Sequence, residues 1–354
     1  MKYIRWIVLS LLLAGIWCAM RSPDMGEAYA RNVYPYISGA LSCFSSLFSF
    51  SIGDCLIYGS MAGLLAYLVY AIVKKRSWRA TAGRMIEYLL WIYVWFYLAW
   101  GLNYFRKDFF TRTEIPYAAY SADAFRSFLS TYTDSLNASF VPVEKIDKAL
   151  VAEEVKKEYH EIAGRFSLVS PAGYLHPKPM LMPFLMSGVG VLGYMGPFFT
   201  EYNLNPDLLP VQYPFTYAHE MAHVLGISSE AEANLYGFLV CSRSGVPEIR
   251  FSAYFALLPY VLSNAYGLLS EEEFNEWKET ISPRGKRSLQ PESRLLGEFV
   301  QPIYRRDPEY RLQLVLERKQ HFLRPEELFG SGGIIDGAGK YVRRDLSPCC
   351  FHIA

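Results

Sequence analysis

Three long apolar runs near the N-terminus constrain the fold of this chain more than any other feature. They cover residues 4–20, 55–73 and 85–103. An α-helix needs about 20 residues to cross the hydrocarbon core of a bilayer, and each run is close to that length. The first run lacks the small-x-small pattern that precedes a signal-peptide cleavage site, so we expect a retained anchor. The sequence therefore predicts a transmembrane region over residues 1–104 with three spanning helices.

The basic residues predict which way these helices face. Between the second and third runs lie Lys74, Lys75, Arg76, Arg79 and Arg84, with no acidic residue among them. By the positive-inside rule this short loop is cytoplasmic. Three crossings then carry the chain outward. We therefore expect a multi-pass protein of the cytoplasmic (inner) membrane, in contact with the lipid bilayer, whose residues 105–354 face the periplasm or the exterior.

Residues 36–53, between the first and second runs, are apolar but interrupted by Ser and Gly. Two interpretations stay open for them. Either the segment lies along the membrane interface, or it extends the second span.

The charge balance excludes a function in nucleic-acid binding. Lys and Arg total 35 against 34 for Asp and Glu, which gives a formal net charge of +1. Binding to a phosphate backbone needs an excess of basic residues on one surface, and this chain has no such excess. We therefore expect no nucleic-acid partner.

The six cysteines give no framework for a metal ribbon or a redox centre. No C-x-x-C pair occurs, and only Cys349 and Cys350 are adjacent. A zinc ribbon or a redox dithiol would need the C-x-x-C spacing. We favour free thiols for Cys349 and Cys350, while a disulfide in an oxidising compartment stays open.

Beyond the membrane region, charged and apolar residues alternate with helical periodicity. The pattern predicts helices over 121–136, 143–166, 248–269, 271–281 and 308–323. Gly, Pro and Met interrupt residues 167–214, and this composition favours one or two short strands with turns, one of them an exposed edge. The predicted fold class is therefore mainly α: three N-terminal transmembrane helices followed by a predominantly helical, zincin-like domain over 105–354 with a short β element.

The sequence "HEMAH" at residues 219–223 carries the chemistry. On an α-helix, His219 and His223 project from one face about one turn apart, as two ligands of a tetrahedral zinc must. Glu220 stands too far round the helix to be a ligand beside them, but it can take a proton from a metal-bound water. Pro214 before the motif and Gly226 after it predict a helix over 215–225. With six His in the chain, chance is a poor explanation for this spacing.

A zinc hydrolase needs a third protein ligand, and Glu230 and Glu232 are the two candidates. If Ser229 caps the next helix, Glu232 completes a capping box and its carboxylate folds back toward the cap. Glu230 is then available, and Asn234 shares its helix face and could orient a ligand histidine. We prefer Glu230, with Glu232 left open, and a role for both as solvated acids in the first turn is the alternative.

The segment "EAEAN" at 230–234 resembles the E-x-E-A-[DN] signature of gluzincin-like peptidases, including membrane peptidases of the CAAX-processing type. The resemblance implies that Glu230 binds zinc and that Asn234 supports a ligand. In this chain the glutamate follows His223 by only seven residues, a shorter connection than in those families.

The chain as a whole resembles a bacterial family known only as a domain of unknown function. The resemblance runs through "YARNVYPYISGALS", "FSIGDCLIYG", "WGLNYFRKDF", "GPFFTEYNLN" and "FTYAHEMAHVLGISSEAEANLYGFLVC", within residues 28–265, and later only through "GGIIDGAGKYV". It implies three N-terminal spans, an extracytoplasmic HExxH domain and a zinc-peptidase-like activity without a defined substrate.

The expected function is hydrolysis of a peptide or protein substrate. Zn²⁺ bound by His219, His223 and Glu230 would activate a water, with Glu220 as general base. The alternative is a membrane-anchored sensor or scaffold whose zinc site is structural or inactive, with Glu232 as a fourth ligand. A hydrolase that acts on cell-wall peptides or another non-protein amide would use the same site.

Five further residues were considered for the substrate site. A strand near 191–205 could pair with an extended peptide, and Glu201, Asn203 and Asn205 alternate along it, although turn and surface roles are favoured for them. Tyr217 and Tyr236 are weak candidates for oxyanion donors, and core packing is the default expectation for both.

Overall fold

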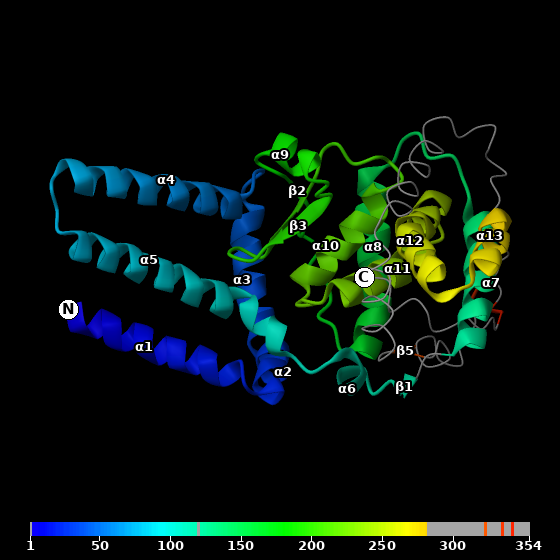
Figure 1. Cartoon of the computed structure of the whole chain (residues 1–354), viewed down its shortest axis with the longest axis horizontal. Helices are drawn as coiled ribbons and strands as arrows, with labels where there is room; N and C mark the ends of the chain where they lie inside the picture. Colours follow the sequence, from blue (N-terminus) through cyan, green and yellow to red (C-terminus); the bar gives the residue numbers. More distant parts are fainter. Residues whose placement is uncertain (1, 119–120, 282–321, 324–333, 336–340, 343–354) are drawn as a thin grey trace. The chain divides into compact units, whose positions relative to one another are not determined.

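The computed structural model describes residues 2–118, 121–281, 322–323, 334–335 and 341–342, and these residues are mainly helical (Figure 1). The chain divides into two compact units. Unit 1 comprises Met1–Asp108, Leu168–Leu208 and Glu220–Ser228. Unit 2 comprises Phe109–Ser167, Leu209–His219 and Ser229–Ala354. Helix α10 (Tyr213–Val224) contributes residues to both units.

Unit 1 begins with the apolar helices of the N-terminal region. They are α1 (Lys2–Ala19), α2 (Pro23–Asn32), α3 (Tyr34–Ser46), α4 (Ile52–Val73), α5 (Trp78–Ala99) and the 3₁₀ helix η1 (Gly101–Phe105). Figure 1 shows α1, α4 and α5 as three long rods side by side. A cluster of buried residues joins α1, α2, α3, α5 and η1 to one another; it includes Leu9, Tyr29, Val94 and Trp100.

Among the described helices, α4 alone is long and apolar enough by itself to cross a membrane. Helices α1 and α2 meet the same test only together, as a pair bent by 108°. Helix α5 coincides with the third predicted run but starts at Trp78, and it ends at Ala99 rather than Asn103 because the chain tightens into η1. By length and composition, one or two membrane spans are therefore supported.

Residues 36–53 do not extend the second span. They form most of α3 and a turn, and α4 begins anew at Ile52, where the Ser51 hydroxyl accepts a hydrogen bond from the Asp54 amide and caps the helix. Figure 1 shows α3 running across the ends of α4 and α5 rather than in line with them.

The remaining part of unit 1 is a small sheet with the strand order β2-β4-β3. It is built from β2 (Lys178–Pro179), β3 (Gly193–Gly196) and β4 (Glu201–Leu204), with the short helix α9 (Pro183–Gly188) between β2 and β3. β2 pairs with β4 in parallel, and β3 pairs with β4 antiparallel in the register Tyr194 to Asn203. β3 is therefore an edge strand in the described sheet, as the sequence predicted for one strand of this segment.

A buried ion pair attaches this sheet to α3 and α4. The Lys178 ammonium donates to the Glu201 carboxylate over 2.6 Å and to the carbonyl and hydroxyl oxygens of Ser45. The same carboxylate accepts hydrogen bonds from the Ser51 hydroxyl, over 2.7 Å, and from the Gly53 amide, over 2.6 Å. Burial raises the pKa of Glu201, but the hydrogen bonds from Lys178 and its neighbours outweigh burial and lower it. The carboxylate is therefore charged at neutral pH.

This network corrects the favoured expectation for Glu201, Asn203 and Asn205. All three side chains are buried rather than at the surface. The alternation places Glu201 and Asn203 on one face of β4, where Glu201 has the partners needed to keep its charge in the interior.

Unit 2 is a helical core made of α6 (Phe109–Thr113), α7 (Ala122–Ser139), α8 (Lys148–Phe166), α11 (Glu230–Arg243), α12 (Pro247–Leu268) and α13 (Glu271–Thr280). Helix α8 starts five residues later than expected because Asp147 caps it by accepting hydrogen bonds from Ala149 and Leu150. The Tyr159 hydroxyl of α8 donates to the Ala218 carbonyl of α10 over 2.6 Å. α11 packs on α8 and α12, and α12 packs on α7.

Two further pairs of short strands and one predicted helix complete the description. β1 (Tyr117–Ala118) pairs with β5 (Phe322–Leu323), and β6 (Ile334–Ile335) pairs with β7 (Tyr341–Val342). The helix predicted over 308–323 lies outside the described residues except for its last two, which form β5. Cys349 and Cys350 also lie outside the described residues.

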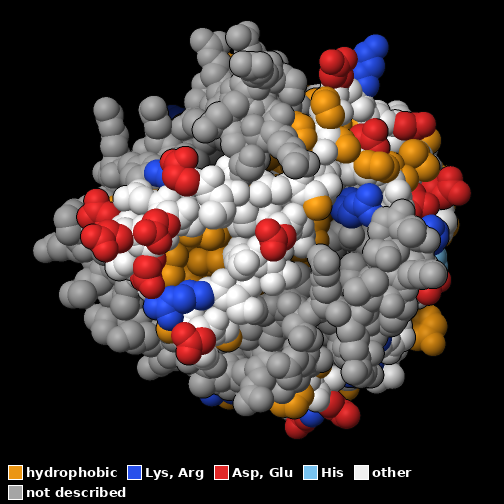
Figure 2. All heavy atoms as spheres, turned by 90° about the vertical axis from the view of Figure 1, so that its right-hand side faces the viewer, with side chains coloured by type: hydrophobic (Ala, Val, Ile, Leu, Met, Phe, Trp, Pro, Cys, Tyr) orange, Lys and Arg blue, Asp and Glu red, His pale blue; other side chains and the backbone are white. Residues whose placement is uncertain are grey.

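The outer surface of unit 2 carries charges of both signs. Figure 2 shows acidic side chains gathered beside basic ones on the face that is at the right of Figure 1, where α13 lies. One such contact joins Arg126 of α7 to Glu273 of α13 over 2.9 Å. Both side chains are exposed, so solvent screens this pair and it contributes little to stability.

We expect Lys178→Met to lower the free energy of unfolding by about 3–5 kcal/mol, because it leaves the Glu201 carboxylate buried without its cation. Lys157→Met is the matched control, since Lys157 pairs with Glu154 at the surface and should contribute at most about 1 kcal/mol. Thermal unfolding of the detergent-solubilised full chain measures both. The double variant Lys178→Met with Glu201→Gln should recover part of the loss, and equal stability of the Lys178 and Lys157 variants would contradict the network's role.

Candidate metal centre

The HExxH segment lies on α10, which ends as the sequence predicted. Gly226 has φ +88°, a left-handed conformation that favours glycine. The Gly226 amide donates to the His223 carbonyl and the Ile227 amide to the Ala222 carbonyl, both over 3.1 Å. These two bonds form a Schellman motif, which stops the helix and turns the chain toward α11.

Side chains from the N-terminal region of unit 1 bind the carbonyl groups at this end of α10. The Trp100 indole donates to the His223 carbonyl over 2.9 Å, and the Tyr34 hydroxyl donates to the Val224 carbonyl over 2.7 Å. Arg106, which is paired with Glu27, donates to the Gly226 carbonyl over 3.1 Å. Carbonyls at a helix C-terminus lack partners within the helix, so these three donors satisfy them and hold the helix end in place.

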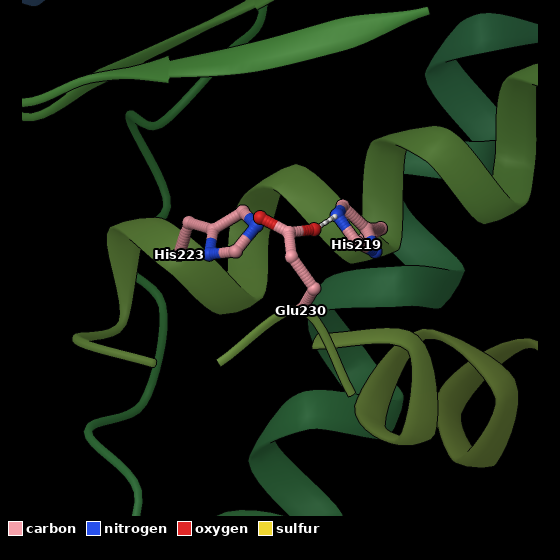
Figure 3. A group of neighbouring side chains, drawn as sticks. All are labelled: His219, His223 and Glu230. Carbon is pink, nitrogen blue, oxygen red and sulfur yellow. Dashed lines mark ion pairs between the residues drawn. The ribbon is translucent and has the colours of Figure 1, made fainter. Parts of the chain in front are cut away.

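The structure brings His219, His223 and Glu230 together. One ligand atom from each lies within 4.8 Å of the others. Figure 3 shows the Glu230 carboxylate between the two imidazole rings, with one oxygen directed to a ring nitrogen of each. The His219 Nε2 to Glu230 Oε2 distance is 3.1 Å. Glu230 is the first residue of α11, so one helix and the start of the next supply the whole group.

Hydrogen bonds at Nδ1 orient both imidazoles. His223 Nδ1 lies 2.7 Å from the Ile227 carbonyl oxygen, and His219 Nδ1 lies 2.8 Å from Asn234 Oδ1. A carbonyl oxygen only accepts, so the neutral ring carries its proton on Nδ1 and keeps the lone pair of Nε2. Nε2 is then the donor atom for a metal ion, and the second nitrogen is held by a protein group, as is usual for ligand histidines.

Glu232 has a different partner from Glu230. Its carboxylate pairs with the guanidinium of Arg112, on α6; the Arg112 side chain is buried and that of Glu232 is 14% exposed. Burial lowers the pKa of Arg112, but the charge of Glu232 and the Tyr236 side chain outweigh burial and raise it, so the guanidinium stays charged. Ser229 caps α11, as expected, by accepting from the Glu232 amide. The Glu232 carboxylate was expected to fold back onto that cap and instead reaches Arg112, for which the sequence had no local signal.

Glu220 lies under the first residue of β3. Its side chain is buried, and a Cβ atom built on Gly193 would be 2.6 Å from Glu220 Oε1 and 2.7 Å from its Cγ. Such distances are too short for a real Cβ contact, so the edge strand can approach Glu220 this closely only with glycine at 193. The Gly193 requirement was not predicted from the sequence, because a single Gly in a Gly-rich segment carries no signal of its own.

Tyr217 and Tyr236 are core residues. Both are fully buried, and the Tyr236 ring packs against Phe166 with a centroid distance of 5.6 Å. This is the default that we expected over a role as oxyanion donors.

Comparison with known proteins identifies the family. A family model described as "Protein of unknown function (DUF3810)" matches residues 29–307. The chain belongs to the DUF3810 family. The match covers the main part of the resemblance, within residues 28–265, and continues to residue 307, but it does not reach the segment "GGIIDGAGKYV". No curated protein and no solved structure matches the chain. The DUF3810 model carries no description of an activity, so the chemistry of this member has to be argued from its own residues.

We expect Glu230→Gln and His223→Ala to reduce the zinc content of the purified full chain, because each removes one of the three grouped donors. Glu232→Gln is the matched control: it should keep zinc while lowering stability, since it breaks a buried pair with Arg112. Asn234→Ala should weaken zinc affinity by about 10- to 100-fold by releasing His219. Zinc-to-protein ratios from plasma mass spectrometry, after dialysis against chelator-buffered zinc, measure all four.

Zinc loss in Glu232→Gln with full retention in Glu230→Gln would reverse the assignment of the third ligand. Equal zinc content in every variant would show that these residues do not bind zinc.

Proposed function

We propose that this member of DUF3810 is a membrane-anchored zinc peptidase that hydrolyses peptide bonds outside the cytoplasm. The observation that carries the proposal is the convergence of His219, His223 and Glu230, with Glu220 on the same helix, α10, as the two histidines. Two imidazoles and one carboxylate are a donor set used by catalytic zinc, which keeps one coordination position for water.

The donor set fits Zn²⁺ in its chemistry. Both Nε2 atoms are directed by hydrogen bonds at Nδ1, and the Glu230 side chain is 71% exposed, so water can reach the group. When bound, the metal supplies a water of lowered pKa and polarises the carbonyl of the scissile bond. Glu220 would act as the general base for the attacking water and would return the proton to the leaving nitrogen.

Strand β3 suits the positioning of a substrate. Within the described residues it pairs only with β4, so its other edge offers backbone donors and acceptors to an extended peptide. Because Gly193 packs on Glu220, a peptide paired along this edge would have its backbone close to the general base. Glycine is required at position 193 because a side chain there would collide with Glu220.

The alternative function, a sensor or scaffold with a structural or inactive zinc site, needs a closed shell of four protein ligands. Glu232 was the expected fourth ligand, and its pairing with Arg112 argues against that role. The group found in the described residues has three members. A hydrolase that acts on another kind of amide would use the same site, and only its substrate would distinguish it from a peptidase.

We also propose that α1, α4 and α5 all cross the inner membrane, with residues after 104 outside. Helix α5 has 22 residues, or about 33 Å, which is enough to span. Its Glu87 pairs with Arg5 of α1 over 3.6 Å, so the acidic charge of α5 has a basic partner within the helix bundle. The basic loop between α4 and α5 supports a cytoplasmic position for that end.

We expect Glu220→Gln to keep zinc and to lose turnover by about 100- to 10,000-fold, the usual contribution of a general base. The full chain in nanodiscs, incubated with a quenched fluorescent peptide library, gives the rate, and plasma mass spectrometry gives the metal content. Full activity of Glu220→Gln with zinc bound would favour the structural site. Glu276→Gln, on the exposed surface of α13, is the control for a neutralised glutamate elsewhere.

We expect Gly193→Ala to reduce kcat/KM by about 10-fold or more while zinc content is unchanged, because the added methyl displaces either Glu220 or the edge strand. Gly188→Ala is the matched control, since a Cβ built on Gly188 meets no atom within 4 Å. The same peptide library measures both variants. If both variants keep wild-type activity, the contact between β3 and Glu220 has no part in catalysis.

A further inference from the structure

The chain between Lys178 and Glu201 contains no charged residue. Residues 181–192 of this stretch, which include α9, form the apolar loop. Six of its large apolar side chains are exposed: Leu181, Met182, Phe184, Leu185, Val189 and Leu192. Phe184 is 82% exposed and Val189 is 74% exposed. Such a concentration of exposed apolar side chains on a single segment marks a surface for a partner or a membrane.

The apolar loop is held in shape at both ends. At its start, the Leu181 amide donates to the Asp54 carboxylate over 3.0 Å. At its end, Asn205 donates from its side chain to the Val191 carbonyl and from its backbone to the Leu192 carbonyl, both over 2.9 Å. The Ser187 hydroxyl, in α9, donates to Asp207 over 2.7 Å. The outward direction of the apolar side chains is therefore set by a hydrogen-bonded backbone.

The anchor residue Asp54 lies in the first turn of α4, the helix most able to span a membrane. It also accepts from the Tyr194 hydroxyl of β3 over 2.6 Å. Near the outer end of α5, the Trp95 indole donates to the Phe198 carbonyl in the turn between β3 and β4. Both contacts lie within unit 1, and Figure 1 shows α9 close to the end of α4 at which that helix begins. The apolar loop thus starts at the level where α4 would leave the bilayer.

We propose that the apolar loop lies in the headgroup region of the outer leaflet, as a second membrane contact beside α4. The proposal rests on the membrane anchoring proposed above and does not depend on peptidase activity. Helix α4 exposes apolar side chains along its length, including Ile57, Met61 and Leu65. The apolar loop continues the lipid-facing surface of α4 without an intervening charge. The lipid that surrounds α4 would therefore also be next to the loop.

The position of the apolar loop affects the candidate site. β3 begins at Gly193, directly after the apolar loop, and Gly193 packs on Glu220. A loop that is fixed in the headgroup region therefore holds the edge strand and the general base close to the membrane surface. Polypeptide segments that emerge from the bilayer would meet this edge first.

Photo-crosslinking in nanodiscs of the full chain tests the proposal. Phe184 is replaced by p-benzoylphenylalanine, a change that removes no packing because the ring is exposed, and Val189 is replaced in a second variant. Leu65, in the middle of α4, is the positive control, and Tyr260, exposed on α12 of unit 2, is the negative control. Irradiation with phosphatidylethanolamine and phosphatidylglycerol in the disc, followed by intact-protein mass spectrometry, measures lipid adducts.

We expect lipid adducts at Phe184, Val189 and Leu65 and none at Tyr260. Adducts at Leu65 but none at either loop position would overturn the loop's contact with lipid while leaving the anchoring intact. Crosslinks from the loop to a second copy of the chain or to another polypeptide would identify a protein interface instead and would equally overturn it. Absence of lipid at Leu65 would remove the membrane anchoring, and the proposal with it.

Discussion

The hydrogen bonds at the C-terminal end of α10 are the interaction on which the candidate site depends. Trp100, Tyr34 and Arg106 each bind a carbonyl group there, and all three come from the N-terminal region that precedes the helix by more than a hundred residues. They hold the helix end, and Gly226 then turns the chain so that Glu230 returns to the two histidines. If these donors were lost, the carbonyls would have to find other partners and the turn would no longer be defined.

A second constraint acts from the sheet. The Lys178 and Glu201 pair fixes β2 and β4 against α3 and the start of α4, and β4 in turn positions β3. β3 can then lie against Glu220 only because residue 193 has no side chain. The general base of the proposed reaction, the edge for a peptide and the apolar loop are thus parts of one hydrogen-bonded arrangement within unit 1. This explains how a small sheet in a mainly helical protein can matter for its chemistry.

Expectations based on local pattern held where the deciding contact is within a few residues. Ser229 caps α11, Gly226 ends α10 and the periodic segments between residues 121 and 281 are helices. Expectations that needed distant partners did not hold. The Glu232 carboxylate was expected at the cap residue Ser229, three residues away, and pairs with Arg112 instead. Glu201 was expected at the surface and is buried with Lys178. A buried carboxylate needs a cation, and its identity depends on which segments the fold brings together.

The sequence by itself determined that the HExxH segment is a helix with both histidines on one face, and where this helix ends. It also determined the mainly helical class and the apolar character of the N-terminal region. Each of these follows from side chains within one or two turns of one another. The tertiary structure decided the rest. It decided between Glu230, which the sequence favoured, and Glu232 as the neighbour of the histidines, paired Glu232 with Arg112 and laid Gly193 on Glu220. These contacts join segments whose distance in space no local pattern encodes, and for that reason they could only be read from the folded chain.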